Sequence, residues 1–203
     1  MKKASLQDEA QGEAEQLVRT ISMRRFGMGL FLVSLAVFFA GSMVVYVVTS
    51  LSRPPAIGQS ATSLPAISWF STLLLLFAGI AMEVAAQRGR WGFIDQRRAL
   101  LAASGLSIAF LITQAVAIFQ LLGQHYEALQ THDIGIFGLT LVLMLIHAAH
   151  IVGGLIPLNM LAMRAWNHRL TPTHSQNVRG CATYWHFLEL VWLSMFAAFL
   201  LLG

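Results

Sequence analysis

Hydrophobic and polar residues follow one another along this chain in long blocks, not at short intervals. Five apolar blocks are each long enough to cross the hydrocarbon core of a bilayer, which is ~30 Å thick and takes about 20 helical residues. The pattern therefore predicts an all-α membrane protein with five transmembrane helices. The expected helices cover residues 26–49, 66–87, 99–122, 134–163 and 181–202.

Residues 1–25 break this pattern, because they are polar and carry charges of both signs. Ala10, Ala14 and Ile21 recur at helical spacing, which favours a short surface helix leading into the membrane. A disordered tail is the alternative for this segment. Residues 26–203 form the second expected part, a single five-helix membrane domain.

The basic residues predict how the chain is oriented. Of the 13 Lys and Arg residues, all except Arg53 fall in the N-terminal tail, between the second and third helices, or between the fourth and fifth. Basic residues are retained on the cytoplasmic side of a membrane. We therefore expect a cytoplasmic N-terminus and a C-terminus on the outer, periplasmic side of a bacterial inner membrane.

Composition narrows the class of protein. The chain is 57% hydrophobic and 11% charged, and its mean hydropathy is +0.67, which excludes an ordinary water-soluble domain. The net charge of +4 comes from residues in particular gaps between helices, so we expect no nucleic-acid partner. The single cysteine, Cys181, excludes an intrachain disulfide framework and a cysteine-based metal cluster.

The last apolar block contains two groups that are costly in lipid. His186 and Glu189 are three residues apart and share one helix face. A charged side chain at the bilayer centre costs ~2.5–3.5 kcal/mol on insertion scales. Trp185, Glu189 and Trp192 form a second line at helical spacing. We interpret these residues as a packed, partly polar seam, with Glu189 nearer the inner interface than the bilayer centre.

The fourth helix carries a second pair, His147 and His150, which also share one face. With His186 and Glu189 they could bind metal, although no further histidine box exists. His150 and His186 could ligate a haem between two helices. A proton relay is a third interpretation. We favour a fourth, in which the imidazoles form hydrogen bonds between helices and hold lipid headgroups or a neighbouring subunit.

The second helix also carries an acid, Glu83, close to its expected inner end. Because Glu83 lies close to the water-exposed interface, we expect it to be a solvated polar group at a helix end. We assign no catalytic residue and no metal ligand in this chain, because the polar groups within the five blocks do not complete a recognisable active site.

Several runs then resemble one family. The run from Tyr184 to Leu193 is similar to the last-helix signature of haem-copper oxidase subunit III, an aromatic-Trp-His-Phe-x-Asp-x-Val-Trp-Leu pattern. The run from His147 to Gly154 resembles that family's His-Gly-x-His segment. Phe38-Phe39-Ala40-Gly41 resembles its first shared helix, and Asp133 with Gly135 and Gly138 resembles the entry to the helix that carries the histidines. The resemblance covers residues 26–203.

The resemblance implies a non-catalytic subunit of a respiratory terminal oxidase, of the cytochrome c type. Such a subunit packs on subunit I, which reduces O₂ and pumps protons, and assembles with subunit II and a small fourth subunit. It binds no haem or copper, because partner subunits hold both, but it holds phospholipid and supports proton uptake. A quinol oxidase or nitric-oxide reductase partner is the alternative within the family, and a free-standing haem b or di-metal enzyme is the alternative outside it.

The chain departs from the family pattern in three places. The number of apolar blocks resembles the five-helix form, which lacks the first two helices of the long form. Leu35 stands where the family commonly has a membrane-embedded glutamate, so the role of that carboxylate does not transfer to this chain. Glu189 replaces the usual aspartate and keeps its charge.

Overall fold

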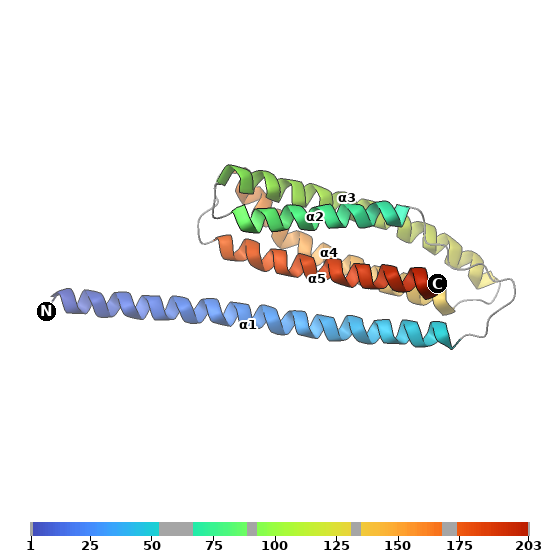
Figure 1. The fold of residues 1–203 in the computed structure, drawn as a ribbon, viewed down its shortest axis with the longest axis horizontal. Helices are drawn as coiled ribbons and strands as arrows, with labels where there is room; N and C mark the ends of the chain where they lie inside the picture. The colour runs from blue at the N-terminus through green and yellow to red at the C-terminus, as the bar shows by residue number, and fades with distance from the viewer. Residues whose placement is uncertain (1, 53–66, 89–92, 131–134, 168–173, 203) are drawn as a thin grey trace. The chain divides into compact units, whose positions relative to one another are not determined.

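The described part of the chain is helical throughout. A computed structural model describes residues 2–52, 67–88, 93–130, 135–167 and 174–202, and for some of these only the backbone. Five helices follow one another in the order shown in Figure 1. They are α1 (Lys2–Leu51), α2 (Ile67–Arg88), α3 (Phe93–Gln130), α4 (Gly135–Trp166) and α5 (His174–Leu202).

Each helix contains a segment long and apolar enough to cross a membrane. These spans are Phe26–Leu51, Ile67–Gln87, Asp95–Gly123, Gly138–Trp166 and Asn177–Leu202. The prediction of an all-helical chain with five such helices is therefore confirmed for the described residues.

The helices extend beyond the apolar blocks that predicted them. Helix α3 begins at Phe93 and ends at Gln130, whereas residues 99–122 were expected, because polar residues continue the helix outside the apolar segment. Helix α4 continues through Pro157 to Trp166. Membrane helices tolerate an internal proline because neighbouring groups satisfy the backbone that it leaves free.

The chain divides into two compact units, residues 1–38 and residues 39–203. The first unit is the N-terminal part of α1, whose described backbone is helical without a break between residues 25 and 26. The surface location expected for residues 1–25 stays a prediction. The second unit contains the remainder of α1 together with α2, α3, α4 and α5.

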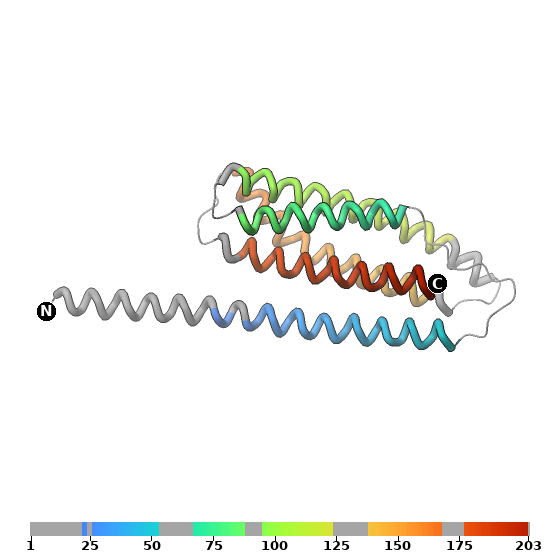
Figure 2. The backbone as a smooth tube through the Cα atoms, viewed as in Figure 1, coloured from blue at the N-terminus to red at the C-terminus, as the bar shows by residue number. Residues whose placement is uncertain are grey.

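Within the second unit, α2 to α5 form a closed four-helix arrangement. Helix α2 contacts α3 and α5, and α4 contacts the same two helices. The backbone trace in Figure 2 shows that successive helices of this group run in opposite directions. Residues on α2 and α5 that are far apart in sequence therefore lie side by side.

The interior of this bundle is filled by large side chains, while its outer faces are also apolar. Trp185 and Trp192 of α5 and Phe110 of α3 are fully buried. Phe77 and Leu190 are more than half exposed. A helix that is apolar on all sides is suited to lipid around the bundle, because water would not stabilise its outer face.

Candidate functional site: a histidine between two carboxylates

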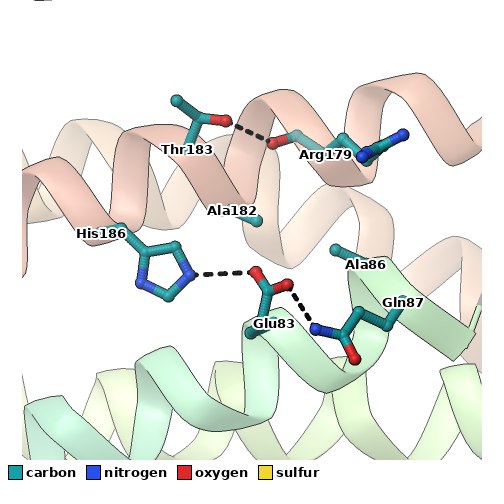
Figure 3. A pocket seen from close by; sticks show the side chains of 7 residues that line it. All are labelled: Glu83, Ala86, Gln87, Arg179, Ala182, Thr183 and His186. Atoms are coloured by element: carbon teal, nitrogen blue, oxygen red, sulfur yellow. Dashed lines mark hydrogen bonds and ion pairs between the residues drawn. The ribbon is translucent and has the colours of Figure 1, made fainter.

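The site begins with the spacing of two residues on α5. His186 and Glu189 lie on one face, and Nδ1 of His186 donates a hydrogen bond to Oε2 of Glu189 over 2.8 Å. The imidazole also reaches across to α2, where Nε2 lies 3.2 Å from Oε2 of Glu83. Figure 3 shows His186 directed from α5 toward Glu83. One imidazole therefore joins two carboxylates from two helices.

Glu83 is held in place by its own helix. Oε1 of Glu83 accepts a hydrogen bond of 2.7 Å from Nε2 of Gln87, one turn further along α2. This contact is drawn as a dashed line in Figure 3. Residues four apart on a helix face the same way, so Glu83 is fixed between Gln87 on α2 and His186 on α5.

The side chains of Glu83 and His186 are much more exposed than that of Glu189. The side chains of Glu83 and His186 are 46% and 42% exposed, whereas that of Glu189 is 12% exposed. The cluster therefore has an accessible end at Glu83 and an enclosed end at Glu189. Glu83 and His186 line the pocket described next, whereas Glu189 does not.

The accessible end lines a pocket of about 480 Å³ between α2 and α5. The short side chains of Ala86 and Ala182 leave this space open, and Arg179 and Thr183 add a positive charge and a hydroxyl group to its wall (Figure 3). The pocket lies where the α2 span ends at Gln87 and the α5 span begins at Asn177. Polar groups in this position face the boundary between lipid and water.

The enclosed end depends on a glycine of α2. A Cβ atom on Gly79 would collide with the carboxylate of Glu189. Oε1 of Glu189 is buried there, and no side chain of the described residues forms a hydrogen bond with it. Glycine at this position lets the two helices approach closely enough for Glu189 to lie against the α2 backbone.

A second histidine region lies farther along the bundle and has a different character. His147 of α4 is fully buried, and neither of its ring nitrogens has a hydrogen-bond partner among the described residues. Its ring stacks on Trp192 with centroids 5.4 Å apart, and it meets Phe39 edge-on at 6.1 Å. Nε1 of Trp192 donates a hydrogen bond to the Thr72 hydroxyl over 2.9 Å.

His150 completes the set of predicted histidines. Its Nδ1 donates a hydrogen bond to the Ile146 carbonyl of the preceding turn over 2.7 Å. The carbonyl of His150 accepts a hydrogen bond of 2.9 Å from the Tyr184 hydroxyl of α5. Next to this contact, a Cβ on Gly154 would lie 2.6 Å from the Tyr184 ring. The segment from His147 to Gly154 thus packs closely against the signature segment of α5.

The structure divides the predicted seam into separate groups. His186 and Glu189 form a hydrogen bond with each other, and the other side-chain partner of His186, Glu83, comes from α2 and not from α4. His147 lies with Trp192, and Trp185 is fully buried.

Glu83 is half-exposed, as expected for a helix end, and in addition it contacts His186. Helical spacing alone contained part of this signal, since Gly79, Glu83 and Gln87 are four residues apart along α2. That spacing places a glycine, a carboxylate and an amide on successive turns of one helix face. It does not reveal that the face is turned toward α5.

The described residues gather no group of three or more His, Cys, Asp or Glu side chains arranged to hold a metal ion. Both ring nitrogens of His186 are occupied by carboxylates, and His147 is enclosed by aromatic rings. The arrangement at His186 is therefore a hydrogen-bonded one.

The fold and these polar groups define a polytopic integral membrane protein with a polar cluster between two of its helices. Comparison with known proteins identifies the family. The chain belongs to the cytochrome c oxidase subunit III family, whose model matches residues 3–203. The resemblance expected from the sequence motifs is thereby confirmed.

Individual relatives agree with the family match. The chain is 29% identical over 182 residues to cytochrome c oxidase subunit 3 of Osphranter robustus, with 86% of this chain and 67% of the relative covered. It is 30% identical over 183 residues to the same subunit of Marchantia polymorpha, covering 86% of this chain and 66% of the relative. The chain thus spans about two thirds of the length of these relatives.

Proposed function

We propose that this chain is the non-catalytic subunit III of a respiratory haem-copper terminal oxidase of the cytochrome c type. The observation that carries the proposal is the family match, which extends over residues 3–203 and includes both histidine-bearing helices. In this assignment haem and copper belong to partner subunits. The chain contacts subunit I directly and assembles with subunit II and a small fourth subunit.

The proposed contribution of the chain is to stabilise subunit I, to hold phospholipid and to support proton uptake during O₂ reduction. The apolar outer faces of α2 to α5 suit both lipid and a neighbouring membrane subunit. Residues such as Phe77 on α2, Phe119 on α3 and Ile156 on α4 are more than half exposed. A large exposed apolar surface is stable only against lipid or a protein partner.

The pocket between α2 and α5 supports the proposed roles in lipid and proton binding. It lies at the ends of two spans and is lined by Glu83, Arg179 and His186, so it offers both charge signs to a headgroup or to water. The distribution of basic residues supports a cytoplasmic location for this end of the bundle, in a bacterial inner membrane. Proton uptake for an oxidase would start from that side.

Purification through an affinity tag on this chain tests the assignment. We expect the eluate from native membranes to contain subunit I and to show the absorption of a haem-copper oxidase, whereas the chain produced alone is colourless. Stoichiometric haem or metal in the chain purified alone would overturn the proposal. Assays with reduced cytochrome c, quinol and nitric oxide then show which of the three complexes the chain serves.

A further inference from the structure

We propose that Nε2 of His186 is a proton-loading site, which exchanges protons with the pocket through Glu83 while Glu189 positions the ring. The site is a property of the α2–α5 cluster itself. Its role in supplying protons to an oxidase rests on the function proposed above.

The number of hydrogen-bond donors in the cluster depends on its protonation state. A neutral imidazole has one N–H donor and one acceptor nitrogen, and an ionised carboxylate only accepts. In the structure both ring nitrogens of His186 face carboxylate oxygens, at 2.8 Å and 3.2 Å. Both contacts are hydrogen bonds only when the cluster holds one proton more than two carboxylates and a neutral imidazole. The two distances are therefore those expected of the proton-loaded state.

The two ring nitrogens of His186 differ in how readily they can exchange that proton with the pocket. The Nδ1 contact with Glu189 is the shorter one and lies at the enclosed end of the cluster, where the carboxylate is only 12% exposed. The Nε2 contact is longer and meets Glu83, whose side chain is 46% exposed and lines the pocket. The proton on Nδ1 is thus retained to orient the ring, and Nε2 is the nitrogen that gains and loses a proton.

Loading and unloading of the cluster each transfer one proton between pocket water and Nε2 of His186. In the unloaded state Nδ1–H donates to Glu189, Nε2 has a lone pair, and both carboxylates are ionised, so the cluster has a net charge of −2. A proton from pocket water joins the carboxylate of Glu83 and passes to Nε2. The cluster then has a net charge of −1, and the new N–H donates back to Glu83. Loss of the proton reverses these steps.

The surroundings of the ring allow this cycle. Helix α5 supplies Glu189 and, one to two turns away, Arg179 and Thr183 in the pocket wall, while α2 supplies Glu83 and Gln87. The hydrogen bond from Gln87 holds Glu83 in reach of Nε2 in both states. Loading adds a charge-assisted contact between α2 and α5, and unloading removes it. The protonation state of His186 therefore changes how firmly two helices are joined.

Nitrogen-15 NMR of the full chain in lipid nanodiscs tests the site. The His186 signals are assigned by their loss in His186→Asn. In the wild-type chain near neutral pH, we expect protons on both ring nitrogens of His186. In Glu83→Gln at the same pH, we expect a proton on one nitrogen only, because an amide can donate to Nε2. Asp95→Asn is the matched control, since it makes the same carboxylate-to-amide change at an exposed position on α3 and keeps both carboxylates of the cluster, so both protons should stay.

Two results would overturn the proposal. One is a wild-type His186 with a single protonated nitrogen, which decides the question even if no variant folds. The other is a Glu83→Gln chain in which both nitrogens stay protonated. The His150 signals report whether a variant is folded, because the His150 ring meets that of Phe39 on α1 with centroids 5.2 Å apart and takes no part in the cluster.

The oxidase role has its own readout in the purified complex. Glu83→Gln should lower O₂ turnover several-fold at alkaline pH, where protons are scarce, and leave turnover at acidic pH unchanged. Asp95→Asn, outside the cluster on α3, should match the wild type at both pH values. A loss that is equal at all pH values would show a structural role and overturn the proton-supply role. Absence of subunit I from the purified complex would instead contradict the proposed function, without affecting the NMR result.

Discussion

His147 and His186 both lie in helices of the same bundle, but their surroundings differ in almost every respect. The His147 side chain is fully buried among aromatic rings, and its ring nitrogens form no hydrogen bond with a described residue. His186 is 42% exposed and has a carboxylate at each ring nitrogen. Thr72, which accepts a hydrogen bond from the Trp192 ring that stacks on His147, and Glu83, which contacts His186, are separated along α2 by roughly 16 Å at 1.5 Å per residue.

This comparison shows that a histidine in a membrane helix can serve as packing or as chemistry, depending on what faces it. The imidazole of His147 acts as a flat ring that stacks on Trp192. The imidazole of His186 acts as a donor that links Glu83 to Glu189. Shape therefore determines the effect of a substitution in the first region, whereas hydrogen bonding and charge determine it in the second.

The largest effect is expected in the aromatic region, from Trp192→Ala. This change removes a fully buried indole, its stacking on His147 and its hydrogen bond to Thr72. Large-to-small core substitutions of this kind cost about 3–5 kcal/mol. Thermal unfolding in detergent should show a large fall in midpoint. Leu190→Ala, on the exposed side of the same helix, is the control and should change the midpoint little.

The next effect concerns how closely α2 and α5 approach, and Gly79→Ala tests it. The added methyl group occupies the space of the Glu189 carboxylate, so the acid or the helix must move. Overpacking of this kind costs about 1–3 kcal/mol. Gly105→Ala is a matched control, because nothing lies within 4 Å of a Cβ at that position. Equal stability of the two variants would show that the contact of Glu189 with the α2 backbone does not contribute to folding.

In the polar region, His186→Ala should weaken assembly more than folding. The change leaves Glu189, which is 12% exposed, without its imidazole partner and breaks the side-chain link to α2. We expect the fraction of purified oxidase that retains this chain or its lipid to fall several-fold, while the haem spectra stay unchanged. Loss of haem from the complex would show that the cluster had been misassigned.

The smallest change in stability is expected from His147→Leu, and it distinguishes His147 most clearly from His186. His147→Leu replaces two ring nitrogens that lack hydrogen-bond partners among the described residues by apolar atoms of similar size. Removing unsatisfied buried polar atoms offsets the lost stacking, so we expect a stability change within about 1 kcal/mol of zero. Loss of several kcal/mol on unfolding in detergent would mean that His147 has a polar partner.

The sequence predicted the membrane helices well because their signal is local. Each apolar block is long enough to cross a bilayer by itself, and the structure has a helix at every one. The pairing of His186 with Glu189 was equally accessible, since it depends on spacing within one helix. The ends of α3 were not, because polar residues around Asp95 continue the helix beyond the apolar signal.

The partner of the His186–Glu189 pair could not be predicted in the same way. Glu83 is 103 residues away in sequence, and its contact with His186 depends on α2 and α5 being neighbours in the bundle. Helical spacing shows which residues share a face, but not which helix that face meets. The same limit led to one continuous seam being expected for His147, His150 and His186, which the structure places in different surroundings.

The central claim is that this chain works as one subunit of a larger oxidase. Native mass spectrometry of the tagged chain, released from its own membranes, measures this directly. The predicted result is a single assembly in which one copy of this chain accompanies a haem-bearing subunit I. Recovery of the chain only alone, or only as an oligomer of itself, would contradict the account.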